Sequence, residues 1–205
     1  ANGMSEAELA DFIRAELEVE SEHSRPLVLP VRSANETKVG RIAFFVSDWS
    51  RGETVKRGII DVSGARPRMV RVEDYDECRC SSLRAASSAR LVAAEPEFVV
   101  ARYIPRTGTC VAVEQTEVFR IGKDGSFERA WQGTTYEAYG ADEAVVADIR
   151  LVDHLAQGDD RAILRTAKRV RCGDEDCFCR DGPLIRDFVE LFLWDPAARQ
   201  FRPAR

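Results

Sequence analysis

Polar and apolar positions follow a helical period in one stretch near the start of the chain. Its apolar residues recur at intervals of three and four, as on one face of an amphipathic helix: Leu9, Phe12, Ile13 and Leu17. Just before them, Ser5 and Glu8 have the spacing of a capping box, in which each residue bonds to the other's backbone N–H group. The sequence therefore predicts a helix over residues 6–18 whose apolar face packs against the rest of the chain.

From residue 39 onward the pattern changes to short runs that are typical of β-strands. Residues 19–38, which include Pro26 and Pro30, predict an extended connector between the helix and these strands. Further on, the pair Asp124-Gly125 supplies the positive φ angles of a tight hairpin turn. Strands are predicted over residues 39–47, 54–62, 68–73, 97–104, 109–115, 116–121, 126–131, 134–139, 187–194 and 200–202.

Residues 143–156 fit two patterns. As a helix, the segment has Asp142 as its N-cap, Gly158 beyond its end and an apolar face. As a strand over residues 145–155, it turns back into residues 161–171 and forms a hairpin with them. The β-branched residues of the segment favour the strand, so the sequence predicts the hairpin.

These elements predict a mainly β fold with one N-terminal amphipathic helix. The strand spacing is typical of an antiparallel sandwich, a barrel or propeller-like blades. No repeat of fixed period supports the propeller over the other two. The predicted division is a helix and connector over residues 1–38 and a single β-rich domain over residues 39–205.

The net charge of −5 is distributed unevenly along the chain. The first 22 residues hold seven acids against the single base Arg14, so the rest of the chain is nearly neutral. A nearly neutral body without a basic block argues against nucleic acid as a partner. Membrane insertion is not expected either, because no apolar run approaches the roughly 20 residues of a spanning helix.

Six cysteines set the candidate covalent chemistry: Cys78, Cys80, Cys110, Cys172, Cys177 and Cys179. An even number of cysteines, clustered in polar segments, is typical of disulfides formed in an oxidising compartment. Zinc ligation by the two C-x-C pairs is the alternative, although structural zinc sites prefer two to four residues between paired cysteines. Free or redox-active thiols beside Arg79 and Arg180 are a third interpretation.

Among the disulfide arrangements, a long-range clamp is predicted to stabilise the fold most. Joining Cys78 or Cys80 to the region 172–179 closes a loop of about 100 residues, which is worth about 4.7 kcal/mol in the chain-entropy model. A local bridge from Cys172 to Cys177 is worth only about 2 kcal/mol in that model. Cys110 is a candidate third member of the clamp.

Aromatic residues near strand ends give the candidate ligand surface. Segment 131–136 (Trp-Gln-Gly-Thr-Thr-Tyr) carries Trp131 and Tyr136, and Tyr139 follows closely. Tryptophan and tyrosine are enriched where proteins bind partners. The same residue types also cover hydrophobic cores at strand ends, which is the more frequent arrangement.

The sequence contains no G-x-S-x-G, P-loop, G-x-G-x-x-G or H-E-x-x-H motif. His23 and His154 lack a neighbouring acid or nucleophile pattern, so no catalytic residue and no cofactor are assigned. The leading hypothesis is a non-enzymatic extracytoplasmic binding or inhibitor-like protein whose partner is a protein or a small ligand. A cytosolic zinc protein that begins at Met4 and a carboxylate-dependent hydrolase are the alternatives. The oligomeric state is left open.

Overall fold

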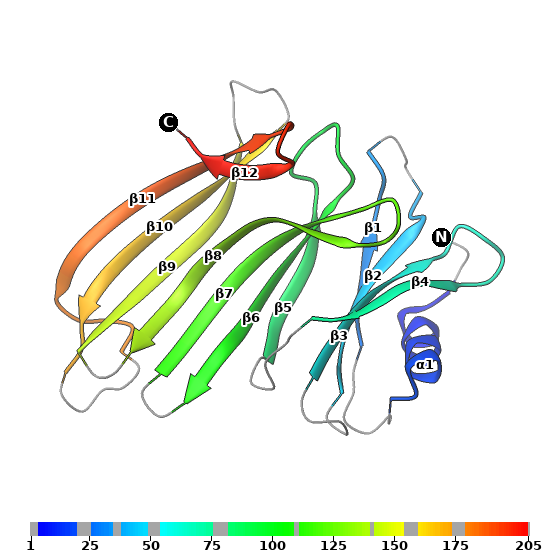
Figure 1. The fold of residues 1–205 in the computed structure, drawn as a ribbon, viewed down its shortest axis with the longest axis horizontal. Helices are drawn as coiled ribbons and strands as arrows, with labels where there is room; N and C mark the ends of the chain where they lie inside the picture. Colours follow the sequence, from blue (N-terminus) through cyan, green and yellow to red (C-terminus); the bar gives the residue numbers. More distant parts are fainter. Residues whose placement is uncertain are drawn as a thin grey trace.

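A computed structural model gives the structure of residues 4–19, 26–34, 38–48, 54–75, 82–108, 111–139, 142–153, 160–173 and 179–204. It contains one helix, α1 (Glu6–Leu17), and two antiparallel sheets. Figure 1 shows α1 beside the smaller sheet, while the larger sheet extends to the opposite end of the molecule.

The helix has the cap that the sequence predicts, and it is one residue shorter than the predicted range 6–18. The Ser5 hydroxyl accepts a hydrogen bond from the Glu8 N–H group, and the Glu8 carboxylate accepts one from the Ser5 N–H group. The helix ends at Leu17, and its C-cap residue Glu18 adopts a left-handed conformation with φ of 52°. Leu9 and Ile13 are buried in a cluster with residues of the smaller sheet. The predicted amphipathic helix and its packing are thus confirmed.

The smaller sheet is a four-stranded meander in the order β1-β2-β3-β4. Its strands are β1 (Leu27–Val31), β2 (Arg41–Asp48), β3 (Thr54–Asp61) and β4 (Arg68–Asp74). β1 lies inside the predicted connector 19–38 and pairs with β2 from Leu27↔Phe45 to Val31↔Arg41. This part of the connector is therefore a sheet strand, which the two prolines concealed. Pro30 is accommodated because β1 is an edge strand of its sheet.

The larger sheet is an eight-stranded meander in the order β12-β11-β10-β9-β8-β7-β6-β5. Its strands are β5 (Ser82–Ala89), β6 (Phe98–Gly108), β7 (Val111–Ile121), β8 (Phe127–Tyr139), β9 (Glu143–Asp153), β10 (Arg161–Arg171), β11 (Leu184–Asp195) and β12 (Gln200–Pro203). β9 and β10 confirm the predicted hairpin for the segment that also fitted a helix. β5 was not predicted from the sequence.

The two sheets pack face to face around an aromatic and aliphatic core. Phe45 and Ile59 of the smaller sheet meet Val99, Phe119 and Phe127 of the larger sheet. The opposite face of the smaller sheet packs on α1. The mainly β prediction is therefore confirmed. Of the three predicted architectures, the structure agrees with the sandwich, because both sheets are open in the described part of the chain.

The ladder between β8 and β9 is much shorter than the other ladders of the long strands. Only three residue pairs join these strands, from Tyr136↔Val146 to Ala138↔Ala144. β7 and β8, by contrast, pair from Val111↔Tyr139 to Ile121↔Phe127. β8 and β9 therefore separate beyond Tyr136, and the larger sheet is split along this line (Figure 1).

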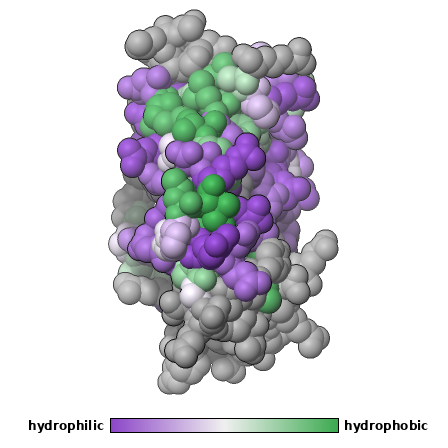
Figure 2. Space-filling view, turned by 90° about the vertical axis from the view of Figure 1, so that its left-hand side faces the viewer, coloured by the Kyte–Doolittle hydropathy of each residue, from purple (hydrophilic) through white to green (hydrophobic). Residues whose placement is uncertain are grey.

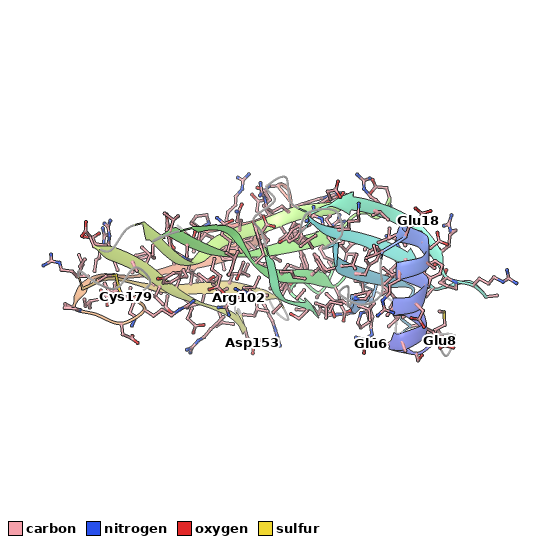
Figure 3. All side chains as sticks on the ribbon, turned by 90° about the horizontal axis from the view of Figure 1, so that it is seen from below. Glu6, Glu8, Glu18, Arg102, Asp153 and Cys179 are labelled. Carbon is pink, nitrogen blue, oxygen red and sulfur yellow. A yellow bond between two sulfur atoms is a disulfide. The ribbon has the colours of Figure 1, made fainter. Side chains whose placement is uncertain are left out.

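A disulfide joins Cys172 and Cys179 at the end of the molecule opposite α1 (Figure 3). These two cysteines pair with each other, so the prediction that they clamp to Cys78 or Cys80 is wrong. β10 ends just before Cys172, and both cysteines lie in the connection from β10 to β11, which begins at Leu184. Neither thiol is available to zinc. Cys78, Cys80, Cys110 and Cys177 lie outside the described residues.

Removing this disulfide by the double substitution Cys172→Ala/Cys179→Ala is expected to lower the free energy of unfolding by about 2.5 kcal/mol, since the bridge closes a short loop. Guanidinium unfolding followed by circular dichroism measures the change. An unaltered unfolding midpoint would contradict a stabilising role for the bridge.

Candidate ligand-binding site at the split between β8 and β9

A cavity of about 310 Å³ lies on one side of the split. Residues from five strands of the larger sheet line it: Ala85, Ala86, Ser87, Val100, Arg102, Thr116, Val118, Thr135, Ala147, Asp148, Ile149 and Leu151. Alanine and serine on β5 and alanine on β9 leave the space open, since their side chains are short. The wall is mostly apolar, with a few hydroxyl groups and the charged side chains of Arg102 and Asp148, the second of which is paired with Arg150.

The Thr135 hydroxyl is the unusual polar group of this cavity. Thr135 is 7% exposed, and its Oγ1 atom has no hydrogen-bond partner among the described groups. The register between β7 and β8 explains its position, because Glu114 pairs with Tyr136 and Gln115 with Thr134. Thr135 is thus the extra residue of a β-bulge, a feature that redirects a side chain. Leaving a buried hydroxyl unpaired costs about 1–3 kcal/mol, so a bound partner for it is favourable.

Two arginines share one buried carboxylate beside this cavity. Glu114 on β7 accepts hydrogen bonds from Arg102, which lines the cavity, and from Arg180, which follows the disulfide, at 3.3 Å. Figure 3 shows Arg102 midway between Cys179 and α1. Glu114 thus neutralises part of the Arg102 charge beside the cavity.

The pKa of the Glu114 carboxyl lies below its ordinary value of 4.5. Burial alone raises this pKa, but the hydrogen bonds and positive charges of Arg102 and Arg180 lower it more. The unfolded chain therefore binds a proton at Glu114 at a higher pH than the folded chain does. The stability that the ionised carboxylate contributes is complete above the unfolded pKa and is lost as the pH falls through the folded pKa.

Replacing Glu114 with glutamine is expected to remove this pH dependence. At neutral pH the wild-type chain is more stable than Glu114→Gln, and the difference narrows as the pH falls below about 4.5. Urea unfolding of both proteins between neutral and acidic pH measures the difference. A gap that stays constant over this range would contradict the role assigned to the two arginines.

A second hollow of about 360 Å³ lies against the other residues of the same β8 segment. Its lining comes from β7, β8, β10 and β11: Gln115, Trp131, Gln132, Gly133, Thr134, Arg165, Glu190 and Phe192. Gln132 donates a hydrogen bond to the side-chain oxygen of Gln115 at 2.6 Å. This hollow is more open and more polar in character than the first.

Arg165 on β10 spans the split beside this hollow. Its Nε atom donates to the Thr134 backbone oxygen at 3.1 Å, and its Nη1 atom donates to Glu190 at 2.5 Å. Thr134 lies where β8 has lost its β9 partner, so the guanidinium replaces a hydrogen bond that a continuous ladder supplies. Only 12% of the Arg165 side chain is exposed. Arg165 thereby connects β8 to β10 and β11 across the opening.

Trp131 lies between the second hollow and the core. It is 5% exposed, and its ring contacts the Phe192 ring edge to face at 5.4 Å. The indole also covers Gly133, where any added Cβ atom collides with the ring. Its Nε1 atom has no hydrogen-bond partner among the described groups. The residue is therefore mostly a packing residue with one polar atom unpaired.

Tyr136, also predicted to bind a ligand, does not line either hollow. Its side chain is buried, donates a hydrogen bond to the Cys179 backbone oxygen at 3.2 Å, and lies under Arg180 at 4.5 Å. These contacts attach the disulfide region to β8. The side chain of Tyr139 is outside the described part of the structure. The ligand-binding role of the three aromatics stays a prediction.

Comparison of the chain with protein-family models, curated proteins and solved structures found no match. Within the described residues, no group of three or more histidine, cysteine or acidic side chains is placed to hold a metal ion. In the part of the chain that the structure describes, no helix is long and apolar enough to cross a membrane.

The segment of β8 selected from the sequence borders both hollows, but most of the residues that line them were not selected. Thr134 and Thr135 belong to segment 131–136, yet nothing in the sequence marks the bulge at Thr135. Arg102 and Arg165 reach the site from strands far away in the chain. The small residues of β5 are a sequence signal for this cavity. Because no strand was predicted there, they could not be assigned to a cavity wall.

Proposed function

We propose that the chain is a non-enzymatic extracytoplasmic binding protein that holds a small, uncharged and largely apolar ligand in the cavity beside Thr135. The observation that supports this most is a buried hydroxyl without a partner in a cavity with an apolar wall. Ligand sites commonly combine such walls with a few polar groups that orient the ligand. The Thr135 hydroxyl supplies one donor and one acceptor.

Size and charge narrow the ligand class. The cavity of about 310 Å³ lies at the lower end of the range of about 300–1,000 Å³ for small-molecule sites. Arg102 is engaged by Glu114, so a charged ligand must compete with an existing ion pair. A neutral molecule with one hydrogen-bonding group fits these features best. The Cys172–Cys179 disulfide supports an oxidising, extracytoplasmic location.

Titration with the neutral fluorophore N-phenyl-1-naphthylamine tests the proposal. The probe is expected to bind wild-type protein with increased fluorescence, because its rings match an apolar wall. Ala147→Leu places a larger side chain inside the cavity and should weaken binding by about tenfold or more, a loss of 1.4 kcal/mol. Ala197→Leu makes the same change in an exposed turn and serves as the control.

Equal binding by wild type and Ala147→Leu would refute the cavity as the binding site. Unfolding midpoints of all three proteins are recorded, so that a folding defect is separated from a filled cavity.

Replacing Thr135 with valine keeps the side-chain shape and removes the hydroxyl. We expect the free energy of unfolding to stay equal or to rise, since an unpaired buried hydroxyl is lost. Affinity for the probe, whose N–H group can donate to Thr135, should fall about fivefold. A destabilisation of about 1–3 kcal/mol would show that the hydroxyl already has a partner within the protein.

A further inference from the structure

One edge of the larger sheet is open along most of its last long strand. β12 pairs with β11 only from Phe192↔Pro203 to Asp195↔Gln200, and the Leu191 oxygen accepts one more bond from the Ala204 N–H group. In the part of the chain that the structure describes, no strand pairs with the outer edge of residues 184–190. Figure 1 shows β11 at the outer side of the sheet, with β12 covering only its end.

This open strand also carries most of the exposed large hydrophobic side chains. Four such residues occur among the described residues, and three of them are on β11: Leu184 at 60%, Ile185 at 41% and Val189 at 69% exposed. Figure 2 faces this side of the molecule and shows apolar patches separated by hydrophilic side chains. Proteins usually protect an open edge with charges, prolines or a covering segment, because an apolar edge pairs with other strands.

We propose that β11 pairs with β11 of a second copy of this chain, antiparallel and centred on Phe188. The two larger sheets then continue into one another across a two-fold axis. The proposal rests on the edge alone and does not depend on the ligand cavity.

Backbone geometry limits the registers that such a pair can adopt. In an antiparallel strand, the N–H and C=O groups of alternate residues point to the same edge. The Leu191 oxygen points to the outer edge, so the backbone groups of Asp187 and Val189 point there as well. Two residues that face each other in an antiparallel pair must both direct their backbone N–H and C=O groups toward the partner strand, or both direct them away from it. A two-fold pair of β11 strands must therefore be centred on a residue, not between two residues.

The charged side chains of β11 favour one residue as the centre of the two-fold strand pair. Centring on Phe188 places Arg186 of each copy opposite Glu190 of the other, which gives two symmetric ion pairs. Centring on Arg186, Asp187 or Glu190 instead places that residue opposite its own copy, and directly opposed like charges destabilise a sheet. Centring on Val189 places Arg186 opposite Phe192 and forms no ion pair.

The two charges of the selected register are suited to pair between copies. Arg186 has no ion-pair partner among the described residues of its own chain, and its neighbour across the ladder on β10 is Arg169. Glu190 is held by Arg165, and its side chain is still 43% exposed. The same register joins Asp187 to Val189 by backbone hydrogen bonds and ends before Leu191, whose oxygen is already bonded to the Ala204 N–H group.

Sedimentation equilibrium of the full chain over a concentration series tests the pairing. Wild-type protein should associate toward twice its monomer mass of 23.0 kDa. Arg186→Glu should weaken the association about tenfold, since it converts two attractive contacts into two repulsive ones. Arg84→Glu makes the same charge change on β5, at the other edge of the sheet, and should leave the association unchanged.

A wild-type chain that stays monomeric at every concentration would overturn the proposal. Equal association of wild type and Arg186→Glu, or equal weakening by Arg84→Glu, would overturn it too.

A cysteine cross-link tests the register directly. Phe188→Cys places two thiols opposite each other on the two-fold axis and should give an oxidised dimer whose linked peptide contains residue 188 twice. In this register Val189→Cys faces Asp187, so its two thiols lie on diagonal positions and should cross-link poorly. Faster cross-linking of Val189→Cys than of Phe188→Cys would overturn the centring on Phe188.

Discussion

Phe45→Ala is expected to lower the free energy of unfolding by about 4 kcal/mol, the usual cost of truncating a fully buried phenylalanine. Phe45 is 1% exposed and lies between the two sheets. Its ring contacts the Tyr75 ring at 5.5 Å and the Phe127 ring at 6.0 Å, both edge to face. Alanine leaves a cavity at the contact on which the sandwich depends.

Urea unfolding followed by circular dichroism measures this loss. Val72→Ala, on the partly exposed surface of β4, is the control and should cost no more than about 0.5 kcal/mol. A loss below about 1 kcal/mol for Phe45→Ala would show that the sheets do not pack as described.

Arg165→Met is expected to cost about 3 kcal/mol, because it leaves the Thr134 oxygen and the Glu190 carboxylate without their donor. Methionine keeps the length and much of the volume of the side chain, so the loss reports the polar contacts. Arg165→Lys is the matched variant. It keeps the charge but has a single donor group that cannot reproduce both contacts, so an intermediate loss is expected.

Chemical denaturation of the three proteins measures these differences. If Arg165→Met is as stable as the wild type, the guanidinium does not hold the two sides of the split together.

Local patterns in the sequence were sufficient for much of the fold. The spacing of Ser5 and Glu8 and the apolar period that follows specify α1 within a few residues. The Asp124-Gly125 turn correctly joined β7 to β8, since Gly125 has φ of 84°. The β-branched residues of segment 143–156 correctly favoured a strand over a helix. Each of these signals acts between residues close in the chain.

Errors in the strand limits have a common physical origin. The breaks predicted after residues 115 and 131 fall inside the continuous strands β7 and β8, close to the two β-bulges of their ladder at Thr135 and Ala130. β5, with the sequence Ser-Leu-Arg-Ala-Ala-Ser-Ser-Ala, has few residues that favour strands. It is a strand because it pairs with β6 along the sheet. Neither a β-bulge nor a strand that forms because of tertiary pairing is marked by a pattern in the neighbouring sequence.

The candidate site was only partly predictable for the same reason. Segment 131–136 was selected because it contains Trp131, but the cavity depends on the position at which the ladder between β8 and β9 ends. That point is set by the three-pair ladder from Tyr136 to Ala138, which no pattern of residue types encodes. The cysteines illustrate the same limit, since composition indicated disulfides while only the fold shows that Cys172 joins Cys179.

Nuclear magnetic resonance of the labelled chain with N-phenyl-1-naphthylamine tests the central claim most directly. The claim is that the cavity beside Thr135 is the binding site. Amide signals should shift for residues that line this cavity on separate strands: Ser87, Thr116, Thr135 and Ala147. Shifts confined to the exposed residues of β11, such as Val189, or the absence of any shift at saturating probe, would contradict it.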